Sequence, residues 1–352
     1  MDLSSATSFL NSLLNYIPDF LRNTEYEKYI QYWPIFVIGM LLAFILTPII
    51  GYIATKYNIT YVPGEKRKDK DFDNPEKALH EGITPALGGL AITIPVLLAL
   101  LFFFRADSFI FPILLSFSVL IVGSALDDIF NLSAKTQFVY QIIAAGIISL
   151  SILNITSLPF INIDLDMYTW NFSVMGLEQS LSLPGDIFLF IWLLVCINAV
   201  KWTAGSPGII EANSLVIFSL IFVIAVRYDS VLSSTLSSLI SGGLLIFLIF
   251  AFPPQKIMTG SAGKSVYGFL ICVLALIADT KISTTMMLLI LPIIDFVFVI
   301  FKRYFTHKPK NFLQLMKLNG PDHLHHQLMR LNLSRTQLVL IEMSITDRKS
   351  VV

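Results

Sequence analysis

Two adjacent carboxylates, Asp127 and Asp128, stand where a long apolar stretch gives way to polar residues. Charged side chains at the border of a membrane segment are costly, and by default they indicate a function. Two carboxylates can hold Mg²⁺, which prefers oxygen ligands, waters and substrate phosphates, or one of them can act as a base. Lys135 follows in the same segment and could meet a phosphate as a point charge. The alternative is a polar turn that only ends a helix.

A second group of reactive side chains, His323, His325 and His326, lies near the C-terminus within four positions. Imidazoles at this spacing could bind zinc, or they could donate hydrogen bonds to phosphate or to base edges. A zinc hydrolase would also need a pattern such as H-E-x-x-H, which the sequence lacks. His80 lies in a separate polar loop and is a further candidate for substrate binding.

Two loops that contain glycine and proline could bind an anion through backbone N–H groups and a helix N-terminus. The first follows Asn198 and includes Lys201, and the second spans residues 252–265 and includes Lys264. Gly263-Lys264-Ser265 resembles the end of a P-loop, but the glycine required upstream is absent and no strand precedes it. These two facts exclude a P-loop NTPase.

A third loop carries Pro85, which is expected to start a helix because its missing N–H costs nothing in the first turn. Gly88 and Gly89 follow and would let two helices approach closely in a membrane. For these glycines we expect packing rather than chemistry.

The elements that position these residues are membrane helices. Hydrophobic types make up 55% of the 352 residues and charged types only 14%, where a soluble domain usually carries about 25% charged residues. The predicted fold is all-α, a polytopic helix bundle with about nine spans. The spans are 34–55, 86–104, 109–125, 137–154, 187–200, 212–226, 235–252, 265–279 and 284–301.

The predicted organisation has four parts. Residues 1–33 form an N-terminal interfacial segment, 34–301 the bundle with its catalytic loops, 302–337 a histidine-containing loop, and 338–352 the start of a final helix. No removable signal peptide is expected, because the N-terminus lacks a basic region followed by a short apolar stretch and a cleavage site. Cys196 and Cys272 lie in apolar runs and are expected to be small buried residues.

Lysine and arginine orient the chain, because cytoplasmic loops are enriched in them. With the loop 56–85 inside, 19 of the 24 Lys and Arg residues fall in inside segments, and so do all five histidines. The longest outside loop, 155–186, has no Lys or Arg. We therefore expect the chemistry at the cytoplasmic face. The formal net charge of zero gives no indication of a nucleic-acid partner.

Taken together, the loops resemble the polyprenyl-phosphate N-acetylhexosamine-1-phosphate transferase family, over about residues 61–337. The most specific matches are the segments 126–135 and 291–326, supported by Pro85-x-x-Gly88-Gly89 and by the segment 252–257. The His-x-His-His form at 323–326 resembles the bacterial GlcNAc-1-phosphate branch, whereas the MurNAc-pentapeptide branch more usually has three consecutive histidines.

The resemblance implies a reaction in the inner membrane of a bacterial cell. Polyprenyl phosphate, such as undecaprenyl phosphate, attacks the β-phosphate of a UDP-N-acetylhexosamine with Mg²⁺, UMP leaves, and a lipid-linked glycan or cell-wall polymer is begun. Asp127 and Asp128 would be the catalytic pair, as base or as ligands of metal and lipid phosphate. The residues implied or proposed to bind substrate are Lys135, His323, His325, His326, Asn198, Lys201, Lys264 and His80. A homodimer is compatible with this resemblance.

The sequence departs from the family pattern at two places. Ser261 stands where the family usually has an Asp that binds Mg²⁺. After the fifth span, Ala204 and Pro207 replace two usual Asp residues, and Lys201 replaces the second Asn of an N-A-x-N motif. An Ala-Gly version with a nearby Glu-Ala, as at 211–212, exists in the eukaryotic and archaeal GlcNAc-1-phosphate branch. One hypothesis is that Lys201 or Lys264 supplies positive charge that Mg²⁺ supplies elsewhere; the alternative is border lysines that obey the positive-inside rule.

The C-terminus departs as well. The family continues into another spanning helix, and residues 335–345 begin one, but 347–352 read like the translation of a sequencing adapter. We expect a missing final helix. Besides an active GlcNAc-type transferase, three readings stay open: a MurNAc-pentapeptide phosphotransferase, a family member that has lost catalysis and kept binding, and a transporter or channel. Transporters place charged residues near the bilayer midplane, and Asp295 is the one clear intramembrane acid here.

Overall fold

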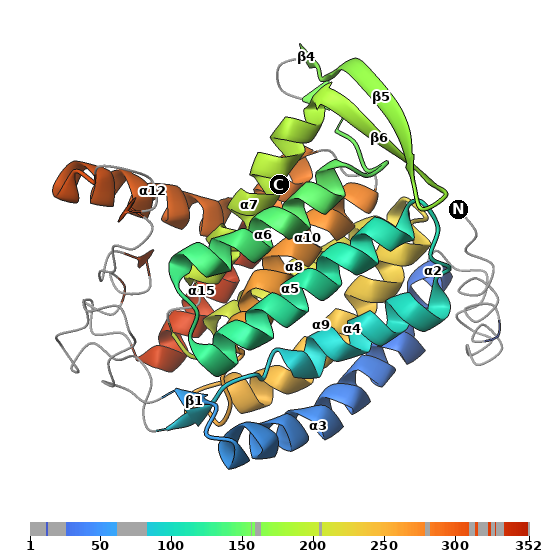
Figure 1. The fold of residues 1–352 in the computed structure, drawn as a ribbon. Coiled ribbons are helices and arrows are strands. Elements are labelled where there is room, and N and C mark those ends of the chain that lie inside the picture. The colour runs from blue at the N-terminus through green and yellow to red at the C-terminus, as the bar shows by residue number, and fades with distance from the viewer. Residues whose placement is uncertain are drawn as a thin grey trace.

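The computed structural model describes residues 12, 26–61, 83–155, 157–158, 163–203, 206–278, 282–309, 314–315, 323–324, 328 and 334–350. It is a bundle of long helices with one β-hairpin at one end, which agrees with the predicted all-α membrane class (Figure 1). The helices are α2 (Glu27–Ile30), α3 (Trp33–Lys56), α4 (Leu90–Phe103), α5 (Ile110–Phe130), α6 (Ala134–Ser149), α7 (Gly185–Thr203), α8 (Ile209–Arg227), α9 (Val231–Ala251), α10 (Gly260–Ile277), α11 (Ile282–Leu288), α12 (Ile290–His307) and α15 (Arg335–Ser350).

Six helical segments of the described chain are long and apolar enough to cross a membrane: Glu27–Lys56, α5, α7, α8, α9 and α10. The chain is therefore an integral membrane protein. The predicted spans 86–104 and 137–154 correspond to α4 and α6, which are shorter, at 14 and 16 residues. The total of nine spans stays a prediction.

The predicted ninth span, 284–301, is not one helix. The chain forms α11 up to Leu288 and then α12 from Ile290, with a turn at Leu289 between them. Pro292 lies in the first turn of α12, where it has no N–H to donate. Figure 1 shows α12 leaving the bundle, and its outer side exposes apolar side chains: Ile294, Val297, Phe298, Phe301, Tyr304 and Phe305.

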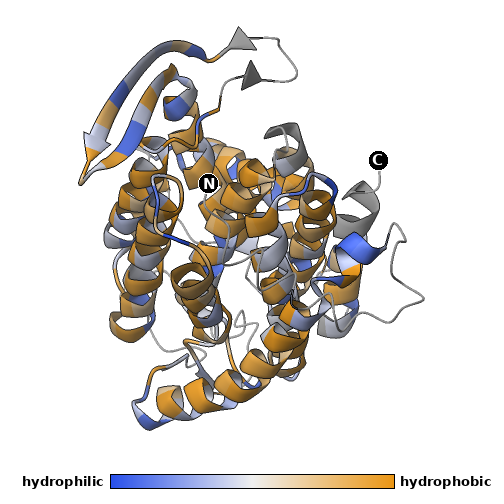
Figure 2. Ribbon diagram, turned by 90° about the vertical axis from the view of Figure 1, so that its right-hand side faces the viewer, coloured by the Kyte–Doolittle hydropathy of each residue, from blue (hydrophilic) through white to orange (hydrophobic). Residues whose placement is uncertain are grey.

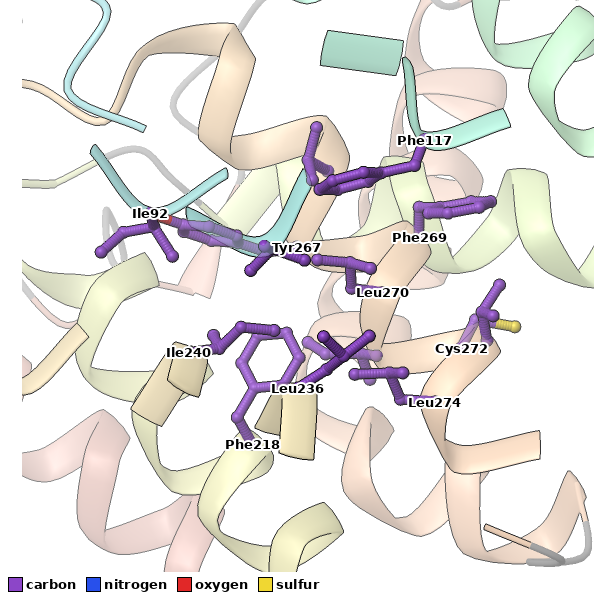
Figure 3. Close-up of a cluster of buried hydrophobic side chains, with 14 of the residues drawn as sticks. Ile92, Phe117, Phe218, Leu236, Ile240, Tyr267, Phe269, Leu270, Cys272 and Leu274 are labelled. Carbon is purple, nitrogen blue, oxygen red and sulfur yellow. The ribbon is translucent and has the colours of Figure 1, made fainter. Parts of the chain in front are cut away.

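Helix α10 forms the centre of the bundle and packs against α4, α5, α7, α8, α9 and α11. Its side chains Tyr267, Phe269 and Leu270 are almost completely buried beside Phe117 of α5 and Phe218 of α8 (Figure 3). Most residues of the helices are apolar, as the colouring of Figure 2 shows, and many large apolar side chains are exposed, which suits a surface that faces lipid.

The two cysteines behave as predicted. Cys196 of α7 and Cys272 of α10 are free and buried within the bundle.

Sequence reasoning missed the hairpin in the loop 155–186. Strands β5 (Asp166–Val174) and β6 (Leu177–Pro184) pair antiparallel, and Met175 and Gly176 both have positive φ, as a two-residue type I′ turn requires. Two short pairs also occur, β1 (Thr60–Tyr61) with β2 (Thr84–Pro85) and β3 (Ser157–Leu158) with β4 (Ile163–Asp164). Gln179 of the hairpin donates to the carbonyl of Ser108, just before α5 begins. The far end of α5 therefore lies away from the hairpin.

The starts of α4, α6, α8 and α10 lie at the end of the bundle opposite the hairpin, because neighbouring helices alternate in direction (Figure 1).

One prediction is wrong at this end of the bundle: Pro85 does not start a helix. It lies in β2, opposite Thr60, and α4 begins only at Leu90. Residues 85–89 instead pair with the segment before α10, through Met258 N to Pro85 O (2.8 Å) and Gly89 N to Thr259 O (2.7 Å).

The close approach of α3 and α9 gives a test of the packing. A Cβ added at Gly242 would collide with the backbone carbonyl of Phe36, which cannot move aside cheaply. We expect Gly242→Ala to destabilise the protein by about 1–3 kcal/mol and to lower its Tm in detergent. Gly146 of α6 has nothing within 4 Å of the same position. Gly146→Ala should therefore leave Tm unchanged or raise it, and equal losses for both variants would contradict this account of the interface.

Candidate active site

The segment around the two carboxylates forms a tight corner between α5 and α6. Helix α5 ends at Phe130, and Asn131 takes the left-handed conformation (φ 51°) that asparagine tolerates at a helix end. Ser133 then caps α6, because its hydroxyl accepts a hydrogen bond from Thr136 N. The corner brings the start of α6 back beside the last turn of α5.

Asp127 lies at the centre of this corner and is 6% exposed. Its Oδ1 accepts hydrogen bonds from Leu132 N (2.9 Å) and from Gln137 Nε2 (2.8 Å). Its Oδ2 accepts from the hydroxyl of Ser261 at 2.5 Å. A buried carboxylate needs such donors to remain charged, and here they come from the α5–α6 turn, from α6 and from α10.

Asp128 holds the start of α10. Its two oxygens accept hydrogen bonds from Ser261 N (2.7 Å) and Ala262 N (3.1 Å), which have no partner within their own helix. Gly260, with φ 69°, is required here, because a Cβ would collide with this carboxylate. The pair Asp127 and Asp128 therefore faces the residue that replaces the usual metal-binding Asp.

The segment between α9 and α10 is also held by α8 and by the residues just before α4. Glu211 in the first turn of α8 is 1% exposed and accepts a hydrogen bond from Thr259 Oγ1. Gly88 and Gly89 contact Met258, Thr259 and Gly263 so closely that no side chain would fit. The expected packing role of these glycines is what the structure shows.

The four lysine and asparagine candidates take different places. Lys135, in the first turn of α6, is exposed. Lys201 donates from Nζ to Gln137 Oε1 at 2.6 Å. Lys264 lies within electrostatic range of both Asp128 and Glu211. Asn198 is buried and uses its amide N–H groups on Gln141 Oε1 and on its own helix, so this group is engaged between α6 and α7.

His323 is held by Asp295 of α12. The Asp295 carboxylate contacts His323 Nδ1 at 2.8 Å and accepts a hydrogen bond from Leu324 N at 2.7 Å. Trp202 packs edge-on against the imidazole, with ring centroids 5.8 Å apart, and the buried Arg303 guanidinium lies 5.1 Å from the Trp202 ring centroid. This carboxylate–histidine pair fixes the orientation of the ring.

The last turn of α7 joins the two groups of candidates. Lys201 reaches Asp127 through Gln137, and the next residue, Trp202, contacts His323. The acidic pair and the histidine segment therefore lie on the same side of the bundle, as a shared site requires. Residues His80, Ala204, His325 and His326 lie outside the described residues, whereas Pro207 is buried in the turn before α8.

The sequence interpretation missed Gln137 and Glu211 as contributors. It noted Asp295 as an intramembrane acid within the family-like segment 291–326 but did not predict its contact with His323. The signal for Gln137 was its position ten residues after Asp127, across a corner marked by Asn131 and Ser133. Gly263, Lys264 and Ser265 resemble the end of a P-loop in sequence, but they lie inside α10 and not in a loop.

A divalent cation is compatible with this donor set. Asp127 Oδ1 has both acceptor positions occupied, but Asp127 Oδ2 and both oxygens of Asp128 have accepted one hydrogen bond each. Within the described part of the chain no group of three or more His, Cys, Asp or Glu side chains is arranged to hold a metal. Mg²⁺ is often bound by one or two carboxylates, with substrate phosphates as further ligands. The two aspartates fit an ion that is bound in this way.

Residues 109–279 match the model of glycosyl transferase family 4. A probable undecaprenyl-phosphate N-acetylglucosaminyl 1-phosphate transferase of Bacillus subtilis is 28% identical over 327 residues, covering 90% of this chain and 82% of that protein. Phospho-N-acetylmuramoyl-pentapeptide-transferases are similar too. The protein of Caldanaerobacter subterraneus is 24% identical over 75% of this chain and 79% of its own length, and that of Staphylococcus carnosus is 24% identical over the same shares.

The hold of Asp295 on the His323 segment can be tested without any activity assay. We expect Asp295→Ala to speed hydrogen exchange at the Leu324 amide by about tenfold or more, because that N–H loses a charged acceptor. Asp295→Asn keeps one oxygen acceptor and should have a smaller effect. Asp229→Ala removes an exposed acid that pairs with Lys28 and should change nothing at Leu324. Unchanged exchange in Asp295→Ala would show that the contact does not hold this segment.

Proposed function

Because residues 109–279 match the model of glycosyl transferase family 4 and the Bacillus relative matches 90% of the chain, we propose that the chain transfers an N-acetylhexosamine-1-phosphate from a UDP-sugar to a polyprenyl phosphate. Undecaprenyl phosphate is the lipid named for the Bacillus relative, and GlcNAc is its sugar. UMP would leave, and the lipid-linked product would begin a glycan or a cell-wall polymer. The observation that carries the proposal is the Asp127–Asp128 pair, with Lys201 and Trp202 connecting it to His323.

The reaction forms one bond and breaks one. An oxygen of the lipid phosphate bonds to the β-phosphorus of the UDP-sugar, and the bond from that phosphorus to the bridging oxygen breaks, so that UMP leaves with this oxygen. Positioning and charge neutralisation supply most of the catalysis in such transfers. Asp127 Oδ2 is the acceptor that would hold the proton or orient the attacking phosphate, since Oδ1 is fully occupied.

Several groups at this end of the bundle could bind the phosphates of the substrates. Lys135 is exposed in the first turn of α6, and Lys264 lies in the first turns of α10. The N-terminus of α6 adds a positive dipole end beside Lys135. His323, oriented by Asp295, would hold the nucleotide-sugar, together with His325, His326 and His80.

Mg²⁺ is the proposed cofactor, held by Asp127 and Asp128 and by substrate phosphates. When bound, it would neutralise charge on the reacting phosphates. The proposed location is the inner membrane with the active end toward the cytoplasm. That orientation is supported by the Lys and Arg distribution, since Lys135, Lys201 and Lys264 all lie at this end. Assembly as a homodimer stays a prediction.

The second candidate activity is transfer of phospho-MurNAc-pentapeptide, the activity named for the relatives from Caldanaerobacter and Staphylococcus. The GlcNAc reading is favoured because the Bacillus relative is more similar over a larger share of the chain. Both readings use the same acidic pair, so they differ in the donor and not in the chemistry.

The acidic pair is tested by Asp127→Asn and Asp128→Asn. In membranes supplied with radiolabelled UDP-GlcNAc and undecaprenyl phosphate, each variant should lose label transfer by at least about 100-fold. Asp229→Asn, at the opposite end of α8, should transfer at the wild-type rate. Wild-type membranes that transfer label no faster than Asp127→Asn membranes would count against the enzyme. That result would favour the reading in which binding is kept and catalysis is lost.

The missing acid at position 261 gives a prediction on the metal. Ser261→Asp restores a carboxylate beside Asp127 and Asp128. We expect a lower half-saturating Mg²⁺ concentration, by about tenfold for one added ligand, and a Tm that rises with Mg²⁺ at lower concentrations than in the wild type. Ser261→Ala, which adds no ligand, is the control. An unchanged Mg²⁺ dependence in both activity and Tm would argue against a metal at these aspartates.

A further inference from the structure

Gln137 is bound at both ends of its amide. Its Oε1 accepts from Lys201 Nζ at 2.6 Å, and its Nε2 donates to Asp127 Oδ1 at 2.8 Å and to Leu132 O at 3.0 Å. An ammonium group has only donors, so the oxygen of Gln137 must face Lys201. The NH₂ group is thereby turned toward Asp127 and the α5–α6 corner.

The direction of the Gln137 amide determines how the two oxygens of Asp127 are used. Oδ1 receives Leu132 N–H and Gln137 N–H, which uses both of its acceptor positions. Oδ2 receives the Ser261 hydroxyl and keeps one acceptor position. The carboxylate is therefore held in one rotation, with Oδ2 toward the start of α10 and away from the corner.

We infer that Lys201 and Gln137 are positioning residues for the proposed transfer. Lys201 sets the direction of the Gln137 amide, and Gln137 fixes Asp127 so that Oδ2 faces the substrate phosphate. The inference rests on the proposed function. It also gives Lys201 a specific task, because an asparagine could present either its oxygen or its NH₂ to Gln137, whereas lysine can present only donors.

A matched pair of amides one turn further along α6 serves as the control. Gln141 Oε1 accepts from Asn198 Nδ2 at 2.9 Å, between the same two helices, and Gln141 is 1% exposed. Neither Gln141 nor Asn198 is among the hydrogen-bond partners of the Asp127 carboxylate, which in the described part of the chain are Leu132, Gln137 and Ser261. A change at Gln141 therefore disturbs α6–α7 packing without touching the orientation of the carboxylate.

The test compares full-length Gln137→Met, Gln137→Glu, Lys201→Met, Gln137→Met/Lys201→Met and Gln141→Met in lipid nanodiscs. UDP-GlcNAc, undecaprenyl phosphate and Mg²⁺ are supplied, and kcat, the two KM values and Tm are measured. Gln137→Met should lower kcat by about 10- to 100-fold, the usual cost of losing a partner of a reacting or ligating group, with little change in either KM. Gln137→Glu keeps an acceptor for Lys201 but replaces the donor to Asp127 with a second carboxylate oxygen, so it should lose at least as much kcat as Gln137→Met.

The double variant decides how Lys201 acts. If Lys201 works through Gln137, the double variant should be no slower than Gln137→Met, because coupled residues are not additive. Lys201→Arg keeps a donor and should retain most of kcat. Additive losses, or a Lys201→Met variant with a raised KM and a normal kcat, would show direct contact with substrate and overturn the inference.

The remaining outcomes separate this inference from the proposed function. A wild type that transfers label and depends on Asp127, but loses no kcat in Gln137→Met, overturns the inference alone. A loss in Gln141→Met equal to that in Gln137→Met assigns the effect to packing and also overturns it. A wild type without transfer overturns the proposed function, and the inference falls with it.

Discussion

The carboxylate of Asp127 is 6% exposed and receives hydrogen bonds from the α5–α6 turn, from α6 and from α10. Leaving such a charge without partners costs about 3–5 kcal/mol, so the donors have to be in place whenever the protein is folded. The geometry of the site follows from this requirement. The left-handed Asn131, the cap at Ser133 and the glycine at 260 are the local features that let three segments reach one side chain.

Polar groups at the neighbouring helix ends also need hydrogen-bond partners, and they find them in other elements. Asp128 satisfies the free N–H groups of α10, Glu211 holds Thr259 just before that helix, and residues 85–89 hold the same segment from the α4 side. Each contact is between elements far apart in sequence, so the start of α10 cannot move without disturbing α4, α5 and α8. The contacts that arrange the site are thus already made in the structure without substrate, which suits a reaction in which positioning supplies most of the catalysis.

The membrane class could be predicted from the sequence, because long apolar runs are local signals, whereas the cytoplasmic orientation of the active end stays a prediction. The acidic pair could also be selected as a candidate, since Asp127 and Asp128 are adjacent and stand at a span border, but its role in catalysis stays a prediction. Gln137 was harder to recognise as part of the site, because its spacing from Asp127 brings the two side chains together only if the chain turns sharply at Asn131. The break at Leu289 was missed because an apolar run looks the same whether or not the helix is interrupted. Pro85 was misplaced because a proline tolerated at a helix start is equally tolerated in an edge strand.

Lys201, which replaces an asparagine of the family pattern, and Lys264, which lies three residues after Ser261, have different surroundings. This difference bears on the hypothesis that they supply positive charge in place of a metal. Lys201 binds the oxygen of Gln137, so its charge reaches Asp127 only through the amide. Lys264 lies in the first turns of α10, near the buried acids Asp128 and Glu211. A lipid phosphomonoester alone carries about −1.5 to −2 at neutral pH, so the single charge of either lysine does not balance two incoming phosphates. The charge balance at this end of the bundle therefore favours a divalent cation that arrives with the substrates over substitution by lysine.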